Sequence, residues 1–405
     1  MSRATLGRQA SLLVSAAVVA HTIWTSAAPA LTYPLYAAEW HLTTFTTTAI
    51  FAIYPVFVVL VLVVFGNISD FIGRRETMLV GLSASAIGTL IFALAPDVGW
   101  IFVGRAFMGV GVGLSAGPSA AAVVEFSAPE KAAQSGGVTA AAQAAGMTLA
   151  ALVGGALIQY APFPTRLNFA VLFVVLLILF VATWRLPNYT ASRPRNHWRP
   201  RVPSIPAGLL STFAAATAAV TASYVLGAMT LSLGAQIARD VVASSNALVN
   251  GGTIALFAIA SAAATIPARR LSPSPVMLVG AAIAVASSAL LTASAYAHSL
   301  ALYAVAQAGS GMAYSLLLLG GLSLLTARAP VTHRGATLSA LFLVAYLAQA
   351  VVALLLGKVA TSASLAAAVD IGVALVATLA VVTILLDRIR ARSGVAGGGR
   401  VPKAR

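Results

Sequence analysis

The stretch that decides the fold is Gly66-Asn67-Ile68-Ser69-Asp70-Phe71-Ile72-Gly73-Arg74-Arg75. This segment, called the 66–75 loop below, places one acid, two glycines and two adjacent arginines between two long apolar runs. Charge is scarce in the rest of the apolar sequence, so its concentration here stands out. A short charged turn between two membrane helices is suited to holding the ends of those helices in one conformation.

The composition of the chain indicates a membrane protein that crosses the bilayer many times. Of its 405 residues, 60% are hydrophobic and 8% are charged, whereas an ordinary soluble domain is about 25% charged. A mean hydropathy of +0.95 cannot be buried inside a water-soluble globule of this size. The apolar runs are continuous rather than alternating, which excludes a membrane β-barrel. The absence of cysteine excludes disulfides, thiol chemistry and cysteine-ligated metals.

The apolar runs predict an all-α protein with twelve transmembrane helices. A helix needs about 20 apolar residues to cross the hydrocarbon layer. Residues 1–30 resemble a signal peptide, but their apolar stretch is long and further spans follow, so we interpret it as the first helix. The predicted spans are 11–37, 44–65, 76–95, 99–124, 135–160, 167–186, 206–235, 246–267, 275–296, 300–326, 335–357 and 364–386.

The distribution of basic residues predicts the orientation. With an even number of spans, both chain ends lie on one side of the membrane. All but four of the 24 Lys and Arg residues fall at the termini or in loops of that side; the exceptions are Arg105, Arg166, Arg239 and Lys358. Basic loops favour the cytoplasm, so both termini are predicted to be cytoplasmic in a cell membrane. These loops account for the net charge of +15 without any binding of nucleic acid.

An internal repeat divides the chain into two halves. The tetrapeptide Met-Leu-Val-Gly at 78–81 recurs at 277–280, and Gly109 and Gly111 recur 200 residues later as Gly309 and Gly311. Parallel repeats of this kind are a transporter architecture. We therefore predict an N-terminal bundle of six helices, a cytoplasmic linker, a C-terminal bundle of six helices and a basic tail that is disordered near anionic lipid. Their bounds are 1–190, 191–205, 206–387 and 388–405.

The 66–75 loop resembles the signature Gly-x-Leu-a-Asp-x-x-Gly-Arg-Arg that follows the second helix in the major facilitator superfamily. The resemblance implies two pseudo-symmetric six-helix bundles and a transporter in which this loop latches the bundles together. It also implies that Gly66 admits another backbone closely, that Gly73 belongs to the turn, and that Asp70 faces the helix start at Gly335. Arg74 and Arg75 are expected to pair with Glu125 at the end of the fourth span. Phe71 stands where the family often has a basic residue, and an ordinary charged hairpin loop is the alternative.

Arg105 begins a second stretch that resembles the family. Arg105-Ala106-Phe107-Met108-Gly109-Val110-Gly111-Val112-Gly113 matches a fourth-helix pattern of an arginine followed by spaced glycines. An arginine in apolar surroundings must find carbonyls, water or a counter-ion. The resemblance implies a role in the proton pathway or in substrate binding. The alternative is a side chain that snorkels to the outer headgroups.

The fifth span carries small residues at helical spacing. Its Gly146, Gly154 and Gly155 resemble an exporter pattern, Gly-x-x-x-Gly-Pro-x-x-Gly-Gly, with Ala150 and Ala151 in place of Gly-Pro. We expect close helix packing at these glycines, as at Gly109 and Gly113 of the fourth span. Ordinary packing of small residues without an exporter role stays an open alternative.

Polar and aromatic residues are expected to line a central cavity. In the resembled fold, spans 1, 4, 7 and 10 surround such a cavity, and residues of the first span fall on one helical face. Pro29 and Pro34 are expected to bend that span and free carbonyls toward the cavity. Lipid-facing packing is the alternative for each aromatic side chain. The candidates are Trp24, Thr25, Thr32, Tyr224, Gln307 and Tyr314, with Tyr54, Gln143 and Gln349 from neighbouring spans.

Proton coupling requires a group that titrates inside the membrane. Carboxylates are scarce in the spans, with Asp370 alone lying well inside one, and the twelfth span is peripheral in the resembled fold. His21, near the middle of the first span, titrates near neutrality in its ordinary state. We therefore assign coupling to His21 together with Arg105. A cavity with Arg105 and no obvious acid favours neutral or anionic solutes, although neutral aromatic rings also hold cations.

These patterns predict a secondary transporter that moves a small organic solute by alternating access, and the resemblance to small-solute exporters favours proton-coupled export. Its partners would be the solute, protons and lipid; we expect a monomer that needs no cofactor, metal or nucleic acid. The chain has no phosphate-binding loop for ATP hydrolysis. Uptake of a metabolite is the alternative within the class. A membrane-embedded enzyme or a channel is the alternative outside it, but the spans offer neither paired catalytic groups nor a ring of coordinating groups.

Overall fold

The chain is built from helices throughout the part that the computed structural model describes. That part comprises residues 5–128, 135–187, 203–206, 208–330 and 333–397. Twelve helical segments within it are long and apolar enough to cross a membrane. The predicted all-α polytopic class with twelve spans is therefore confirmed.

The first six spans are regular helices joined by short connections. Two short helices, α2 (Tyr33–Glu39) and α4 (Ser69–Ile72), follow the first and second spans. The six spans are α1 (Arg8–Ala27), α3 (Thr44–Phe65), α5 (Arg74–Leu94), α6 (Val98–Phe126), α7 (Ser135–Tyr160) and α8 (Leu167–Trp184).

The last six spans begin with a composite helix. The seventh span consists of α9 (Leu210–Ala228), the π-helical turn η3 (Met229–Leu233), α10 (Gly234–Gln236) and a second π-helical turn, η4 (Ile237–Val241). The remaining spans are α11 (Ala247–Ala268), α12 (Pro273–Tyr296), α13 (Leu300–Arg328), α14 (Arg334–Ser362) and α15 (Leu365–Gly397).

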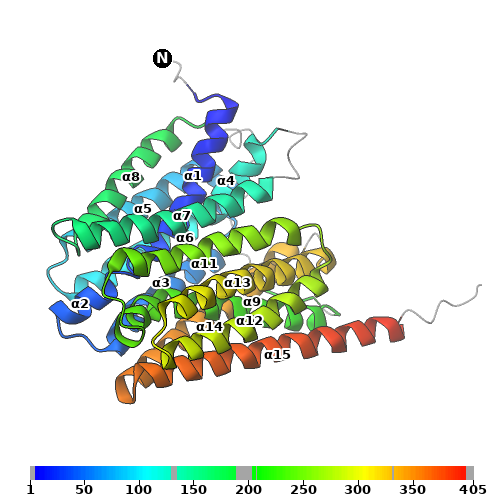
Figure 1. Cartoon of the computed structure of the whole chain (residues 1–405). Helices are drawn as coiled ribbons and strands as arrows, with labels where there is room; N and C mark the ends of the chain where they lie inside the picture. The colour runs from blue at the N-terminus through cyan, green and yellow to red at the C-terminus, as the bar shows by residue number, and fades with distance from the viewer. Residues whose placement is uncertain (1–4, 129–134, 188–202, 207, 331–332, 398–405) are drawn as a thin grey trace, which may run out of the picture.

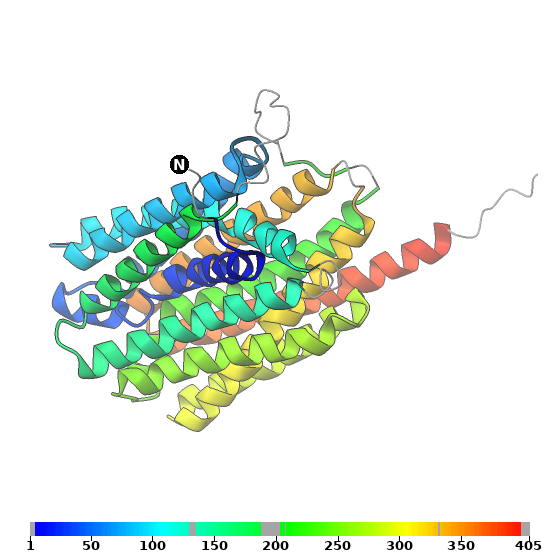
Figure 2. The same ribbon diagram turned by 90° about the horizontal axis from the view of Figure 1, so that it is seen from above.

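The helices form two bundles of six that meet along two helix pairs. In Figure 1, α7 and α11 lie side by side where the two bundles meet, and α3 packs against α14 as the second pair. The helices run along a common direction, and α15 projects beyond its neighbours (Figure 2). We call the end where α1 begins and α15 finishes the terminal end, and the other the opposite end.

The first span breaks ten residues before its predicted end at 37. α1 stops at Ala27, and the chain turns before α2 begins at Tyr33. Pro29 causes the break, because it has no amide hydrogen for the carbonyl four residues earlier. Pro34 sits in the first turn of α2, where a missing amide hydrogen costs nothing. The expected bend at the two prolines is thus a full interruption.

The predicted ends of two other spans are wrong. The seventh span continues past 235 to Val241 because its π-helical turns keep the chain helical. The twelfth continues past 386, since α15 runs to Gly397 and includes residues that we expected in a disordered tail. Arg390 explains this extension: its side chain is buried and bonds Asp387 at 2.7 Å and Ser274 of α12 at 2.7 Å. Residues 398–405 of the tail and most of the linker 191–205 lie outside the described residues.

Hydrogen bonds across the boundary close the opposite end. They join α3 to α14, α7 to the start of α11, and the irregular part of the seventh span both to α3 and to the broken first span. The pairs are Phe45 N to Thr361 Oγ1 at 2.9 Å, Gln236 Nε2 to Thr44 Oγ1 at 3.3 Å, Arg239 Nη1 to Pro34 O at 3.1 Å, and Ala247 N to Gln159 Oε1 at 2.8 Å. At the terminal end, Arg269 of α11 donates to Gly136 O of α7.

Two glycines let the backbones approach at the boundary. A Cβ at Gly251 of α11 would overlap the carbonyl oxygen of Ala151 in α7. A Cβ at Gly357 of α14 would overlap Thr48 Oγ1 in α3. Inside a bilayer helices gain little from the hydrophobic effect, so this close van der Waals packing holds the bundles together.

Replacing Gly251 by alanine should separate α7 from α11. Overpacking of this kind costs about 1–3 kcal/mol, so we expect Gly251→Ala to lower the thermal unfolding temperature of the purified protein by several degrees. Gly252→Ala is the matched control, because no atom lies within 4 Å of the position that its Cβ would take and alanine is the better helix former. Equal unfolding temperatures for the two variants would contradict the packing.

Candidate transport site

Arg105 lies inside the first bundle and is completely buried, with 0% of its surface exposed. The start of α6 sets its position: Asp97 caps the helix by accepting from Gly99 N at 2.8 Å. Two turns into α6, the side chain of Arg105 faces α1. An arginine in such surroundings costs several kcal/mol unless its charge is compensated.

Two carbonyl groups of α1 hold the Arg105 guanidinium. Nη1 donates to Thr25 O at 3.3 Å and Nη2 donates to Ser26 O at 3.2 Å. The amide that would normally bond Thr25 O belongs to Pro29, which has no hydrogen, and Ala30 N bonds Ala27 O instead of Ser26 O. The break in the first span therefore creates the two acceptors, and the negative end of the α1 dipole adds to the attraction.

Aromatic rings complete the surroundings of Arg105. Its guanidinium carbon lies 4.6 Å from the ring centre of Tyr54 and 5.8 Å from that of Phe51, within the range of cation–π attraction. Tyr33 Oη lies near the guanidinium of Arg105 and interacts with it, but neither Tyr33 Oη nor Arg105 Nε makes a hydrogen bond of regular geometry. In the described part of the chain, no carboxylate forms an ion pair with Arg105. The charge is thus held by dipoles and rings, and hydrogen-bonding capacity is left over.

His21 lies on α1 one helical turn before Thr25, and its side chain faces α5 rather than Arg105. Its Nδ1 contacts Val18 O of its own helix, and its Nε2 lies 3.5 Å from Ser85 Oγ of α5. The side chain is 1% exposed. The structure thus gives His21 and Arg105 separate sets of contacts within the first bundle rather than a direct bond.

Tyrosines of the second bundle meet Tyr54 across the boundary. Tyr54 lies within electrostatic range of Tyr224, Tyr314 and Tyr346. The rings of Tyr224 and Tyr346 pack edge to face with their centres 4.8 Å apart, and their hydroxyls interact with each other. All three second-bundle side chains are only half-buried. These side chains bring three phenol groups of the second bundle close to Tyr54 of the first.

Sequence reasoning missed part of this aromatic cluster. Phe342 and Tyr346 of α14 both pack on Tyr224, and Phe257 of α11 packs on Tyr314 with ring centres 5.5 Å apart. Phe342 and Tyr346 are four residues apart and therefore share one helix face. That spacing was a signal in the sequence, but nothing in the sequence tells which face of the eleventh span meets the boundary.

Other predicted lining residues are scattered. Trp24, Thr25 and Thr32 are buried in the first bundle. Gln349 of α14 is buried, with Oε1 unpartnered, whereas Gln143 of α7 is exposed. The placement of Gln307 at the central boundary is wrong. Its amide bonds Tyr303 and Thr230 inside the second bundle, because the tenth span turns that face toward the seventh.

The chain is similar to known proteins in both sequence and architecture. The family model "Major Facilitator Superfamily" matches residues 13–272. The chain belongs to the major facilitator superfamily. It is therefore a multi-pass membrane protein, and members of this superfamily are secondary transporters that bind small molecules and work by alternating access. Members of this family and fold are transporters rather than enzymes.

Solved structures share the fold of this superfamily member at low sequence identity. A bacterial homolog of the human lysosomal transporter Spinster, inward-facing and unoccupied, matches with a TM-score of 0.71 and 14% identity over 94% of this chain and 97% of that one. The occupied inward-facing form of that homolog matches with a TM-score of 0.70 and 13% identity over the same shares.

A curated relative covers a smaller region. An "MFS-type transporter" of Aspergillus terreus (strain NIH 2624 / FGSC A1156) is 30% identical over 95 residues, which is 24% of this chain and 17% of that protein. The match thus spans less than a fifth of the relative's length.

In this superfamily member the 66–75 loop is a turn fixed by Gly73. Gly73 separates α4 from α5 with φ of 104°, a conformation that favours glycine. Arg74 then reaches Glu125 of α6 at 2.5 Å. Both side chains are about a third exposed, so the pair adds at most about 1 kcal/mol, and its main effect is to position α5 against α6.

Three expected contacts of the loop are absent from the described structure. Arg75 pairs with Glu76 at 3.0 Å rather than with Glu125, because it follows Arg74 and points to another side of α5. The nearest atoms to a Cβ at Gly66 belong to Leu62 of the same helix, so no second backbone approaches there. Asp70 is exposed and accepts no hydrogen bond from the start of α14 at Gly335.

The predicted packing glycines lie at helix contacts. A Cβ at Gly109 would meet Tyr54 O at 2.7 Å, and one at Gly113 would meet Val61 Cβ at 2.8 Å. In α7, a Cβ at Gly146 would overlap Ala20 O, at Gly154 it would approach Asn168 at 3.3 Å, and at Gly155 it would meet Ala247 O at 2.8 Å. Gly109 thereby brings α6 against the backbone of Tyr54, whose ring covers Arg105.

Replacing Arg105 should separate stability from transport. Arg105→Met exchanges a buried charge for an apolar chain of similar length, so we expect an unchanged or higher unfolding temperature and at least a tenfold loss of solute counterflow. Arg105→Lys keeps the charge but cannot donate to both carbonyls in fork geometry, and it should also lose transport. Full counterflow in Arg105→Met would contradict a role in the transport site.

Asp70→Asn should impair conformational switching more than solute affinity. The carboxylate makes no contact with the α14 start in this structure, so its stabilising contact there belongs to another conformation. We expect a lower rate of solute exchange with an unchanged half-saturation concentration. Glu39→Gln, an exposed carboxylate at the opposite end, is the control. A change in affinity alone would exclude the latch interpretation.

Proposed function

We propose that this chain is a proton-coupled exporter of small aromatic solutes that are neutral or anionic. The observation that carries the proposal is Arg105, a fully buried cation that no carboxylate of the described residues pairs with. Its charge disfavours a permanently cationic solute nearby and favours an anionic group. Tyr54 contacts Arg105 on one side and lies near the second-bundle tyrosines on the other.

The aromatic cluster supports a planar solute. A ring inserted between Tyr54 and the pair Tyr224–Tyr346 would find aromatic faces in both bundles, and ring pairs contribute about 0.5–1.5 kcal/mol each beyond their buried area. The phenol groups of Tyr314 and Tyr346, two residues that are half-buried as a whole, would supply hydrogen bonds to polar substituents. Contacts in both bundles are what a solute needs to bias the two conformations of an alternating-access carrier.

The basic loops support a cytoplasmic position for the terminal end. With that orientation, the hydrogen bonds at the opposite end close the outer side, and the disengaged Asp70 lies on the cytoplasmic side. The structure then corresponds to the half of the cycle in which solute enters from the cytoplasm.

His21 is our candidate for the proton-carrying group. Of the four histidines in the described residues, His41, His298 and His333 lie outside the spans, and His21 lies within one. Its neighbour Ser85 and the nearby Thr25 and Ser26 carbonyls provide polar groups between it and Arg105. After solute release, His21 would bind a proton from the outer side, carry it across as the empty carrier resets, and release it to the cytoplasm, because a second positive charge near Arg105 disfavours the protonated ring.

Transport in proteoliposomes tests the proposal and its direction. A panel should contain aromatic carboxylates, neutral aromatics, quaternary ammonium compounds and sugars. With the lumen acidic, an antiporter accumulates solute, whereas a symporter does so when the outer solution is acidic. We expect saturable accumulation of aromatic carboxylates with the acidic lumen; accumulation with the acidic exterior would establish uptake instead, and linear non-saturating flux would indicate a pore.

His21→Gln separates coupling from carriage. Because glutamine cannot carry a proton, we expect accumulation driven by the pH gradient to fall at least tenfold while solute counterflow without a gradient persists. Asp370→Asn, which removes the acid inside the twelfth span, should keep both activities. Full gradient-driven accumulation by His21→Gln would overturn the assignment of His21.

A further inference from the structure

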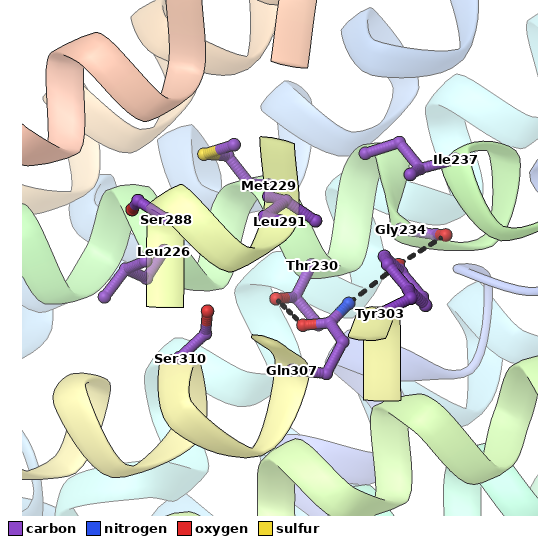
Figure 3. Close-up of a pocket in the computed structure, with 10 residues that line it drawn as sticks. All are labelled: Leu226, Met229, Thr230, Gly234, Ile237, Ser288, Leu291, Tyr303, Gln307 and Ser310. Atoms are coloured by element: carbon purple, nitrogen blue, oxygen red, sulfur yellow. Dashed lines mark hydrogen bonds between the residues drawn. The ribbon is translucent and has the colours of Figure 1, made fainter. Parts of the chain in front are cut away.

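A small cavity with both polar and apolar walls lies between helices of the second bundle. Its volume is about 10 Å³, and its walls come from the seventh, ninth and tenth spans (Figure 3). The polar residues that line it are Thr230, Ser288, Tyr303, Gln307 and Ser310, with the backbone of Gly234. A cavity of this volume is about large enough for one water molecule and far too small for an organic solute.

A chain of hydrogen bonds runs along one wall. Thr230 Oγ1 donates to Gln307 Oε1 at 3.2 Å, Gln307 Nε2 donates to Tyr303 Oη at 2.8 Å, and Tyr303 Oη donates to Gly234 O at 2.8 Å (Figure 3). These hydrogen bonds fix the tenth span to the irregular part of the seventh. The amide of Gln307 could make further hydrogen bonds, since an amide nitrogen has two hydrogens and an amide oxygen has two lone pairs.

Two serine hydroxyls face the cavity without a partner. Ser288 of α12 is 3% exposed and Ser310 of α13 is 5% exposed, and neither hydroxyl forms a hydrogen bond with the described residues. Neither hydroxyl oxygen is among the polar atoms that have no partner and no accessible surface. Both oxygens therefore keep some accessible surface, which borders the cavity. A buried hydroxyl left without a hydrogen bond costs about 1–3 kcal/mol, which a guest with hydrogen-bonding groups would remove.

We propose that one water molecule occupies this cavity and bonds Ser288, Ser310 and the Thr230–Gln307 pair. Water fits because the lining residues supply neutral donors as well as acceptors, and a buried water normally makes about three hydrogen bonds. An alkali cation fits less well, because no carboxylate lines the cavity and the cost of burying its charge would go uncompensated. The bound water connects the seventh, ninth and tenth spans, whereas the hydrogen bonds along the wall connect only the seventh and the tenth.

The position of the water links it to closure of the opposite end. The cavity lies behind η3 and α10, and the same irregular segment carries Gln236 and Arg239, which bond Thr44 and Pro34 of the first bundle. π-Helical turns often mark functional sites. The water therefore braces the segment that closes the boundary, and its loss should make the closed arrangement less stable. This inference does not depend on the identity of the transported solute.

The double variant Ser288→Ala/Ser310→Ala tests the site directly. It removes two partners of the water while keeping the cavity open. A structure of the full chain that resolves ordered water should show one peak within hydrogen-bond distance of both hydroxyls, and the double variant should lack it. An empty cavity in the wild-type protein would overturn the proposal. Ser288→Ala alone serves if the double variant does not fold.

The second measurement follows the opposite end. The chain has no cysteine, so Glu39→Cys and Ser245→Cys, which are exposed in the two bundles at that end, provide the two labelling sites for distance measurements between spin labels. We expect the water-site variant to raise the ratio of open to closed populations roughly five- to tenfold, as for the loss of about two hydrogen bonds. An unchanged ratio, with the water peak lost, would overturn the link to closure.

Two controls exclude other causes. Ser315 of α13 is 5% exposed, as Ser310 is, but its hydroxyl donates to Met312 O of its own helix. Ser315→Ala should therefore leave the distance distribution unchanged; an equal shift would overturn the specific role of the cavity. Unfolding temperatures in sodium, potassium and choline chloride should coincide. A saturable stabilisation by sodium that the double variant loses would overturn water in favour of a cation.

Discussion

The bond between Arg105 and the broken end of the first span is the constraint on which the centre of this molecule depends. A guanidinium that is fully buried needs acceptors, and Pro29 provides them by leaving Thr25 O without its helical partner. The interruption of α1 and the burial of the charge therefore require each other. Together they fix α6 against α1 and hold the Tyr54 ring where it meets the second bundle.

The second bundle repeats this interruption by other means. α9 ends at Ala228, about 200 residues after the end of α1 at Ala27, and the chain continues through two π-helical turns instead of a proline break. Tyr303 donates to Gly234 O within that segment, as Arg105 donates to Thr25 O in the first bundle. The two irregular segments meet at the opposite end, where Arg239 bonds Pro34, so closure uses the parts of both bundles that regular helix packing does not immobilise.

The sequence predicts those features that rest on one residue type or on a long apolar run. Twelve spans follow from hydropathy, a bend in the first span follows from Pro29, and the Arg74–Glu125 pair follows from two charges on one side of the membrane. The π-helical turns have no comparable residue signal. The direction of the Gln307 side chain depends on the rotation of α13 about its axis. The extension of α15 depends on the pair of Asp387 and Arg390, which becomes buried against Ser274 only when the bundle packs. Contacts of Asp70 depend on the conformation as well as the residue.

How Arg105 is compensated also determines what proton coupling can use. A carboxylate partner would have formed a pair whose protonation switches the local charge, whereas carbonyl dipoles have no protonation state to change. In the exporter proposed above, Arg105 therefore acts on the solute, and the group that gains and loses a proton is a different one. His21 fits that second role because it lies one helical turn away on the same helix that supplies the carbonyls. The proposal thus assigns the solute and the proton to two side chains that both act on α1.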